Sequence, residues 1–267
     1  MQSTKASSPT RGRAPGDQQP GIHVYCIADG GHEARLGPIG IDGCEVYSLP
    51  YRDICAVVHD CPVQPYQSSD SQVVAGRVTA HLGVVDAAWE RWSTVLPLAF
   101  GTIVKDQDSV ARWLASEYDN LTRKIEAVRG KAEYGVQLFW EPRTVARDIA
   151  AKSEAIRGLE EEVRSKPKGT AYLLRQRVES ILRREMETRA SECFKDFRLR
   201  IQQHVCDIRL EKTRKAGEDK QMIANLSCLV HREKSSELGK ELEAIEGMEG
   251  FSVRFTGPWP PYSFVDR

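Results

Sequence analysis

The stretch "CDIRLEKTRKAGEDKQMIANLSCLVHR" (206–232) has the pattern of two strands joined by a polar turn. The turn, "RKAGEDK" (214–220), is mostly charged and has no apolar side chain larger than that of alanine. Side chains along a strand point alternately to its two faces. Alternation in the second strand, residues 221–232, therefore predicts a buried face made of Met222, Ala224, Leu226, Cys228 and Val230.

Two more strand patterns flank this hairpin. "YGVQLFWE" (134–141) lies before it, and "FSVRF" (251–255) lies after a short helix that ends at Gly247. Between the first strand and the hairpin, a helical pattern runs from 145 to 163 and is ended by "SKPKGT" (165–170), because proline removes a helical hydrogen bond. A longer helix then extends to about His204.

The resulting order, β-α(α)-β-β-α-β, is typical of an antiparallel sheet of about four strands with helices on one face. We therefore expect a modified ferredoxin-like domain with an enlarged helical first crossover in residues 132–256. The longer helix is expected to bury one apolar stripe. The stripe consists of Leu182, Met186, Ala190, Cys193, Phe197 and Ile201.

The N-terminal half predicts a separate α+β domain in residues 22–131. Strand patterns occur at 22–28, 44–50 and 54–60, and 94–104 is extended. Two helices are predicted, the second starting after Asp108 as N-cap and ending at Gly130. The expected apolar stripes are Val78, Leu82, Val85, Trp89 and Trp92 in the first helix, and Val110, Leu114, Leu121, Ile125 and Val128 in the second.

The expected fold class is thus α+β with two domains and a tail at each end. Residues 1–21 are rich in Ser, Pro, Gly and Arg, with no aliphatic side chain larger than alanine's after Met1, so we expect a disordered tail. Residues 257–267 form a C-terminal tail rich in proline and aromatic residues.

Composition argues against several classes of partner. The chain has 38 Lys+Arg and 38 Asp+Glu among 267 residues, so its net charge is zero, which disfavours a surface built for nucleic acid or an anionic membrane. It has no run of about eighteen apolar residues, so no membrane insertion is expected. Seven cysteines without a CxxC spacing fit reduced thiols in a cytoplasm.

The reactive patterns of common enzymes are absent from the sequence. It has no Walker loop, no GxGxxG after a strand, no HExxH and no GxSxG. The best metal candidate is Cys55, His59 and Cys61 on one strand face, with Cys44 on the partner strand. We interpret these cysteines as core residues and His81 as a histidine on the flank of its helix. The sequence therefore predicts no catalytic, cofactor-binding or metal site.

Several segments resemble one known family in order along the chain. "VLPLAFGTIV" (95–104) is similar to the "vlPlrFGTvf" segment of the gas vesicle protein F/L family, and "TGPWPPYSFV" (256–265) to its C-terminal signature. "VYCIAD" (24–29), "AEYGVQLFWE" (132–141) and "KGTAYLLRQR" (168–177) also match its pattern. The family usually has Arg where this chain has Ala99.

The resemblance implies an accessory or minor structural protein of gas vesicles, which are hollow, gas-filled protein shells. It implies a cytoplasmic protein at the gas vesicle, without catalysis or a cofactor. The implied partners are the major shell protein, which is hydrophobic, and other accessory proteins during nucleation, with no small-molecule substrate and no nucleic acid. Chaperone, nucleator and wall component stay open as roles, as does the choice between the F and L branches.

Two other classes of function compete with this reading. A nucleic-acid-binding regulator would use the ferredoxin-like sheet, yet the strand at 221–232 has no aromatic side chain on which bases stack. A hydrolase or metal enzyme would need the residues around Cys55 and His59.

Candidate interaction residues come from the two apolar segments that prolines make rigid. Phe100 is expected to be a core anchor between the two N-terminal helices. The C-terminal tail is expected to cross the C-terminal domain and to dock between the domains as a clasp, with a free arm for partners as the alternative. The candidates are Pro97, Phe100, Gly101, Gly257, Pro258, Trp259, Pro260, Pro261, Tyr262 and Phe264.

Overall fold

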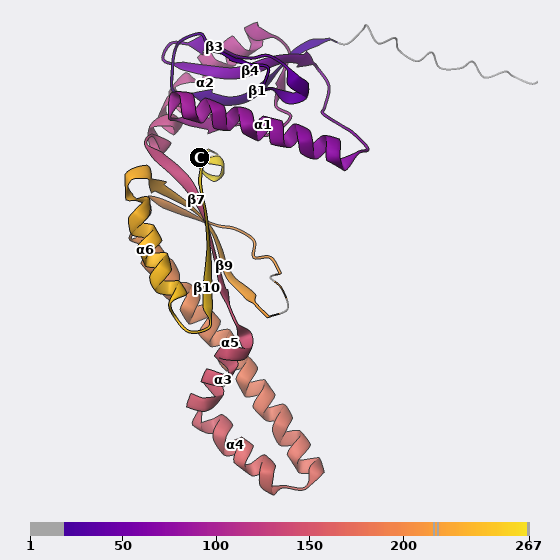
Figure 1. Cartoon of the computed structure of the whole chain (residues 1–267), viewed down its shortest axis with the longest axis vertical. Coiled ribbons are helices and arrows are strands. Elements are labelled where there is room, and N and C mark those ends of the chain that lie inside the picture. Colours follow the sequence, from indigo (N-terminus) through magenta and orange to yellow (C-terminus); the bar gives the residue numbers. More distant parts are fainter. Residues whose placement is uncertain (1–18, 216, 218, 266–267) are drawn as a thin grey trace, which may run out of the picture. The chain divides into compact units, whose positions relative to one another are not determined.

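A computed structural model describes residues 19–215, 217 and 219–265 (Figure 1). The fold is mixed α/β, and the chain divides into two compact units, Met1–Glu126 and Ala127–Arg267. The division lies a few residues before the boundary expected after residue 131. Most of the predicted tail at 1–21 lies outside the described residues, and its last two residues already belong to the first strand.

The described residues of the first unit form one sheet of six strands that differ in length. Its strands follow the order β2-β3-β4-β1-β5, and β6 also pairs with β1. The strand patterns at 44–50 and 54–60 correspond to β3 and β4, which form an antiparallel hairpin with a tight turn in which Arg52 has a φ of 54°. The strands are β1 (Pro20–Ala28), β2 (Arg35–Gly37), β3 (Val46–Tyr51), β4 (Ile54–Pro62), β5 (Val95–Pro97) and β6 (Ile103–Val104).

Helix α1 (Ser71–Trp92) packs on β1, and its buried face shares only Val85 and Trp92 with the predicted stripe. The Asp70 carboxylate accepts from the backbone N–H of Gln72 at 2.8 Å and caps the helix. Leu82 of the predicted stripe is 41% exposed, so that assignment is wrong. Apolar residues lie around much of α1, so periodicity alone does not fix which side meets the sheet. The buried residues are His81, Val84, Val85, Ala88 and Trp92.

Helix α2 (Gln107–Val128) buries the predicted stripe, from Val110 to Val128. It is capped by Asp106 and not by Asp108, because the Asp106 carboxylate accepts from the backbone N–H of Ser109 at 2.7 Å. Gly130, with a φ of 69°, follows its C-terminus. Left-handed backbone of this kind is easiest for glycine and commonly ends a helix.

The second unit contains a four-stranded sheet of order β10-β7-β9-β8. Every neighbouring pair is antiparallel, which is the arrangement expected from the element order. The last strand is longer than predicted and continues to Trp259. The strands are β7 (Lys131–Trp140), β8 (Asp207–Leu210), β9 (Gln221–His231) and β10 (Phe251–Trp259).

The helices of this unit are α3 (Pro142–Lys152), α4 (Glu154–Ser165), α5 (Lys168–Gln202) and α6 (Ser235–Glu246). The single helix predicted across 145–163 is wrong, because Ser153 has extended backbone (ψ 110°) between α3 and α4. Its hydroxyl donates to the Glu185 carboxylate of α5 at 3.0 Å.

Helices α5 and α6 lie along one face of the sheet, and α4 with the start of α5 extends past it (Figure 1). Arg200 of α5 forms an ion pair with Glu241 of α6. Phe197 and Ile201 of the predicted α5 stripe are buried. In the described part of the chain, no helix is long and apolar enough to cross a membrane.

Candidate functional site

The C-terminal segment, residues 260–265, is bound to the sheet of the second unit. Pro260 and Pro261 are buried, and a short 3-10 helix (Tyr262–Phe264) follows. Phe264 and Val265 are 6% and 8% exposed. The end of the described chain is therefore packed like core, although chain termini are usually frayed.

A buried carboxylate holds this segment. Glu133 of β7, only 8% exposed, accepts from the backbone N–H of Ser263 at 2.7 Å and from its hydroxyl at 2.6 Å. The Ser263 hydroxyl also lies 3.2 Å from that of Ser227 on β9. The Arg209 guanidinium of β8 stacks over the Phe264 ring at 5.4 Å. Three strands of one sheet thus fix the segment, with charge-assisted hydrogen bonds at its centre.

Gly257 lets the chain reach this position. Its φ is 119°, which side chains rarely tolerate, and a Cβ there would approach the Glu133 carbonyl oxygen to 2.9 Å. Pro258 follows in strand β10, and Trp259 is paired with Glu133 in register but remains 49% exposed. The C-terminal segment therefore packs on the sheet of the second unit, whereas the predicted clasp, in which the tail docks between the domains, stays a prediction.

The other predicted segment forms a turn in the first unit. Pro97 ends β5 and is buried, and Gly101 has a φ of 85°. The Thr102 N–H and hydroxyl both donate to the Ala99 carbonyl, at 3.2 and 2.7 Å. Phe100 is only partly buried, so it is not the fully buried anchor that we expected.

Phe100 borders a cluster of three buried histidines that the sequence analysis missed. Its ring lies 5.8 Å from that of His81 and 6.3 Å from that of His23. His23, His59 and His81 are at most 2% exposed. The description of His81 as a helix-flank residue is therefore wrong. The available signal was that His23 and His59 sit within strongly apolar strand segments, "IHVYC" and "AVVHD".

Hydrogen bonds define the protonation of this histidine cluster (His23, His59 and His81). His81 Nε2 lies 3.1 Å from the Leu98 carbonyl oxygen and therefore carries a proton that it donates. His81 Nδ1 then accepts from His23 Nε2 at 3.1 Å. His59 Nε2 lies 2.9 Å from the Tyr66 hydroxyl. Among the described residues, the Nδ1 atoms of His23 and His59 have no hydrogen-bond partner.

Burial keeps the cluster uncharged. It lowers the pKa of His23 to about 3, with smaller contributions from His59 and His81, and it lowers the pKa of His59 to about 4. Burial also lowers the pKa of His81 and raises that of Tyr66. Neutral histidines beside an un-ionised tyrosine provide no charged nucleophile at neutral pH, so the cluster is best read as a polar part of the core.

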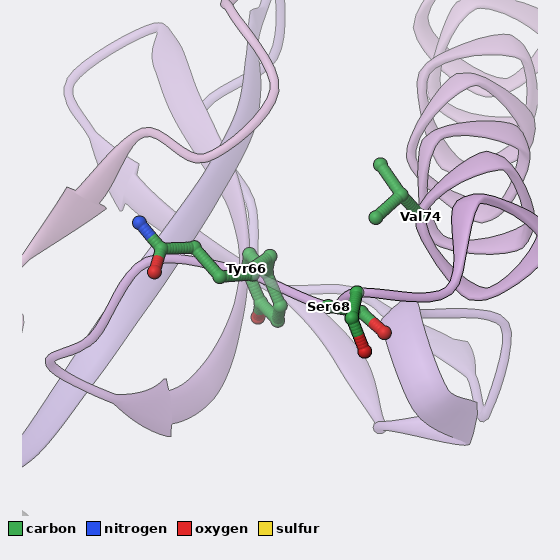
Figure 2. Close-up of a pocket in the computed structure, with 5 residues that line it drawn as sticks. Tyr66, Ser68 and Val74 are labelled. Carbon is green, nitrogen blue, oxygen red and sulfur yellow. The ribbon is translucent and has the colours of Figure 1, made fainter.

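A surface pocket lies next to the cluster (Figure 2). It is lined by Tyr66 and Ser68 from the loop before α1 and by Val74 from the first turns of that helix, together with Gln67 and Ser69. The lining offers hydroxyl and amide groups but no carboxylate or cationic side chain. This pocket therefore lacks the paired acid and base groups of common hydrolytic sites.

The metal candidate on β4 does not assemble. Cys55 pairs with Ala28 in register and His59 with His23, so about 13 Å separates them along the strand. No group of three or more potential ligands that could hold a metal ion occurs in residues 19–215, 217 and 219–265. Cys55 and His59 share a face of β4, but the strand spacing keeps them too far apart to bind one metal ion.

Comparison with known proteins identifies the family of this chain. The family model described as gas vesicle synthesis protein GvpL/GvpF matches residues 21–266. The chain belongs to the GvpL/GvpF family. Gas vesicle protein L1 of Halobacterium salinarum is 30% identical over 254 residues, which cover 92% of this chain and 90% of that protein. Gas vesicle protein L of a Streptomyces species is 27% identical, covering 86% of each.

A solved member of the GvpL/GvpF family shares the fold. The crystal structure of GvpF from an Anabaena species superposes with a TM-score of 0.74, covering 92% of this chain and 98% of that one, at 19% identity. GvpF from Microcystis aeruginosa gives a TM-score of 0.64 over 92% of this chain. These structures support the fold, whereas the family match over residues 21–266 and the L1 relative confirm the resemblance found in the sequence motifs: the chain is a gas vesicle-related protein.

Proposed function

We propose that this protein is a non-enzymatic accessory protein of gas vesicle assembly. It binds the hydrophobic major shell protein, limits its aggregation, and acts with other accessory proteins during nucleation, in the cytoplasm at the growing vesicle. The observation that carries the proposal is the GvpL/GvpF family match across residues 21–266. The neutral, buried histidine cluster and the separated residues of the β4 metal candidate add support.

The physical reason for such a protein lies in the shell. A wall that keeps liquid water out needs a strongly apolar inner face. Free subunits with that face and with open strand edges would aggregate. A net-neutral protein that presents complementary apolar surface can cover them until assembly. Exposed large side chains of this kind include Phe255, at 40%, and Trp259, at 49%.

In this proposal the second unit is a ferredoxin-like domain with an enlarged first crossover. The β10-β7-β9-β8 order and the helices α5 and α6 on one face support that classification. Domain limits of 22–131 and 132–256 follow from it. Pro97, Phe100 and Gly101 shape the turn of the first unit, and the C-terminal segment locks the second.

The nucleic-acid-binding alternative gains no support from the sheet. Strand β9 carries no aromatic side chain, and the C-terminal segment occupies its Ser227 position on the face away from the helices. Base stacking on such sheets needs exposed aromatics at the centre of that face.

The test is solubility of the shell protein in a purified system. The intact protein is mixed with major shell protein diluted from denaturant, and the shell protein that stays in the supernatant is measured. We expect a dose-dependent increase without nucleotide or metal, compared with an equal mass of an unrelated protein. A strict requirement for ATP, or no increase at any ratio, would contradict the proposal.

A further inference from the structure

The outer edge of strand β10 has backbone groups that point away from the neighbouring strand β7. The Glu141 N–H donates to the Gly250 carbonyl at 2.8 Å, which sets the phase of the β7–β10 ladder. Hydrogen-bonding direction alternates along an antiparallel strand. The N–H groups of Val253 and Phe255 therefore point away from β7. The Val253 N–H reaches a Glu246 carboxylate oxygen at 3.5 Å, which agrees with this phase.

The second half of this edge is open to solvent. Residues 254–259 are all exposed in the intact chain. Phe255 is 40% exposed, and its ring stacks on Tyr134 at 5.2 Å and an interplanar angle of 16°. The aromatic side chain is thus held in place beside its own outward-facing backbone, so that little conformational freedom remains to be lost on binding.

A hollow lies beside the first half of the same edge. It is lined by Ser252 to Arg254 of β10, by Glu246 of α6, by Phe139 of β7 and by Gly217, Asp219 and Lys220 of the turn before β9. The hollow therefore lies between the first half of β10 and this polar turn, and its lining combines the Phe139 ring with the charged side chains of Asp219, Lys220, Glu246 and Arg254.

The opposite edge of the sheet differs in a way that favours β10. Strand β8 spans only Asp207–Leu210, whereas β10 spans nine residues. The Ile208 N–H on β8 is taken by the Asp207 carboxylate of the same strand, at 2.9 Å. Short strands and local capping of this kind protect an edge against added strands. On β10 the Val253 N–H is capped by Glu246, and a register shift with Pro258 interrupts the ladder after Thr256. Between these two points, the exposed stretch from Arg254 to Thr256 is centred on Phe255.

We infer that the β10 edge, centred on Phe255, binds an extended strand of the major shell protein by strand addition. The inference rests on the proposed function and names the surface that performs it. An open ladder requires an extended backbone as its partner, because alternating N–H and C=O groups match another strand and not a helix, whose groups bond internally. Apolar side chains of the added strand would meet Phe255 and Trp259, which are 40% and 49% exposed.

The test separates the backbone from the side chain. Phe255→Pro removes both the ring and the outward N–H, and proline is tolerated on edge strands whose N–H faces solvent. Phe255→Ala removes the ring but keeps the N–H. The matched control is Leu210→Pro on the opposite edge, where Leu210 is 56% exposed and its N–H also points outward. Shell-protein solubilisation is titrated with each full-length variant.

We expect Phe255→Pro to raise the protein concentration needed for half-maximal solubilisation of the shell protein about tenfold or more. Phe255→Ala should raise this concentration by less, and Leu210→Pro should leave it at the wild-type value. Equal losses in Phe255→Pro and Leu210→Pro, or wild-type behaviour of Phe255→Pro, would overturn the inference while leaving the proposed function standing. An inactive wild type would instead refute the proposed function.

A measurement on the unmodified chain covers the case in which Phe255→Pro fails to fold. Amide hydrogen exchange is compared for the free protein and its complex with the shell protein. The Phe255 amide should become at least tenfold slower in the complex, and the Leu210 amide should not change. Unchanged exchange at Phe255 in a formed complex would refute strand addition.

Discussion

Mild acid should destabilise the first unit through the histidine cluster. In the unfolded chain each histidine has an ordinary pKa of 6.5, whereas burial lowers the pKa of His23 to about 3 and that of His59 to about 4. Nearby Asp60 and Asp42 raise the pKa of His59, but by less than burial lowers it. Protonation at His23 Nδ1 would place a new N–H where the described residues supply no acceptor.

The magnitude follows from linkage. A folded pKa below the unfolded one means that the unfolded state binds protons first, so stability is complete above pH 6.5 and falls as the pH drops toward the folded pKa. At pH 5 each of His23 and His59 costs about 2 kcal/mol, from about 1.4 kcal/mol per pH unit below the unfolded pKa. His81, whose pKa is also lowered, acts in the same direction.

The assay is urea unfolding at pH 8, 7, 6 and 5, followed by tryptophan fluorescence. Wild type is compared with His23→Gln, which keeps a side-chain donor toward His81 but cannot titrate. The control is His32→Gln, because His32 is exposed. Between pH 8 and pH 5, the stability of His23→Gln should fall by about 2 kcal/mol less than that of the wild type. An equal fall in wild type, His23→Gln and the control would refute the reasoning.

Three further predictions concern the two segments singled out by the sequence. Phe100→Ala should cost about 2 kcal/mol in urea unfolding, less than for a fully buried ring, because Phe100 is partly exposed; a loss below about 0.5 kcal/mol would show that its ring contacts are incidental. Ser263→Ala should release the C-terminal segment by removing two hydrogen bonds of its hydroxyl, seen as faster carboxypeptidase digestion, and unchanged digestion would count against the Glu133 clamp. Gly257→Ala should lower the melting temperature, because Gly257 has a φ of 119° and lies close to the Glu133 carbonyl. The control Gly239→Ala on α6, where a Cβ meets nothing within 4 Å, should not lower it. Equal melting temperatures of the two variants would argue against strain at Gly257.

The sequence by itself determined the buried face of those strands and helices whose apolar residues lie mainly on one side. In strand β9 the predicted core residues Ala224, Leu226, Cys228 and Val230 are buried, because alternation fixed their face. Met222 is only half-buried, since the register shifts between it and Ala224. The stripe of α2 is the only apolar side of that helix, and it is buried as predicted. The antiparallel order of the second sheet followed from the succession of strands and helices, because few connections between them are allowed. The family motifs were equally local in sequence.

Tertiary structure decided where patterns were ambiguous or contacts were distant. Helix α1 has apolar residues on more than one side, so only packing on β1 selected the buried face. The break at Ser153 interrupts a helical pattern that periodicity alone continues. Phe100, expected inside the core, lies at the border of the histidine cluster.

The two sites were hidden from sequence for the same reason. His23 and His81 are 58 residues apart, and Glu133 and Ser263 are 130 residues apart. No local spacing encodes such pairs, because the fold alone brings them within hydrogen-bonding distance. The sequence showed rigid, apolar residues near the C-terminus, but only the tertiary structure showed that the buried Glu133 carboxylate binds them.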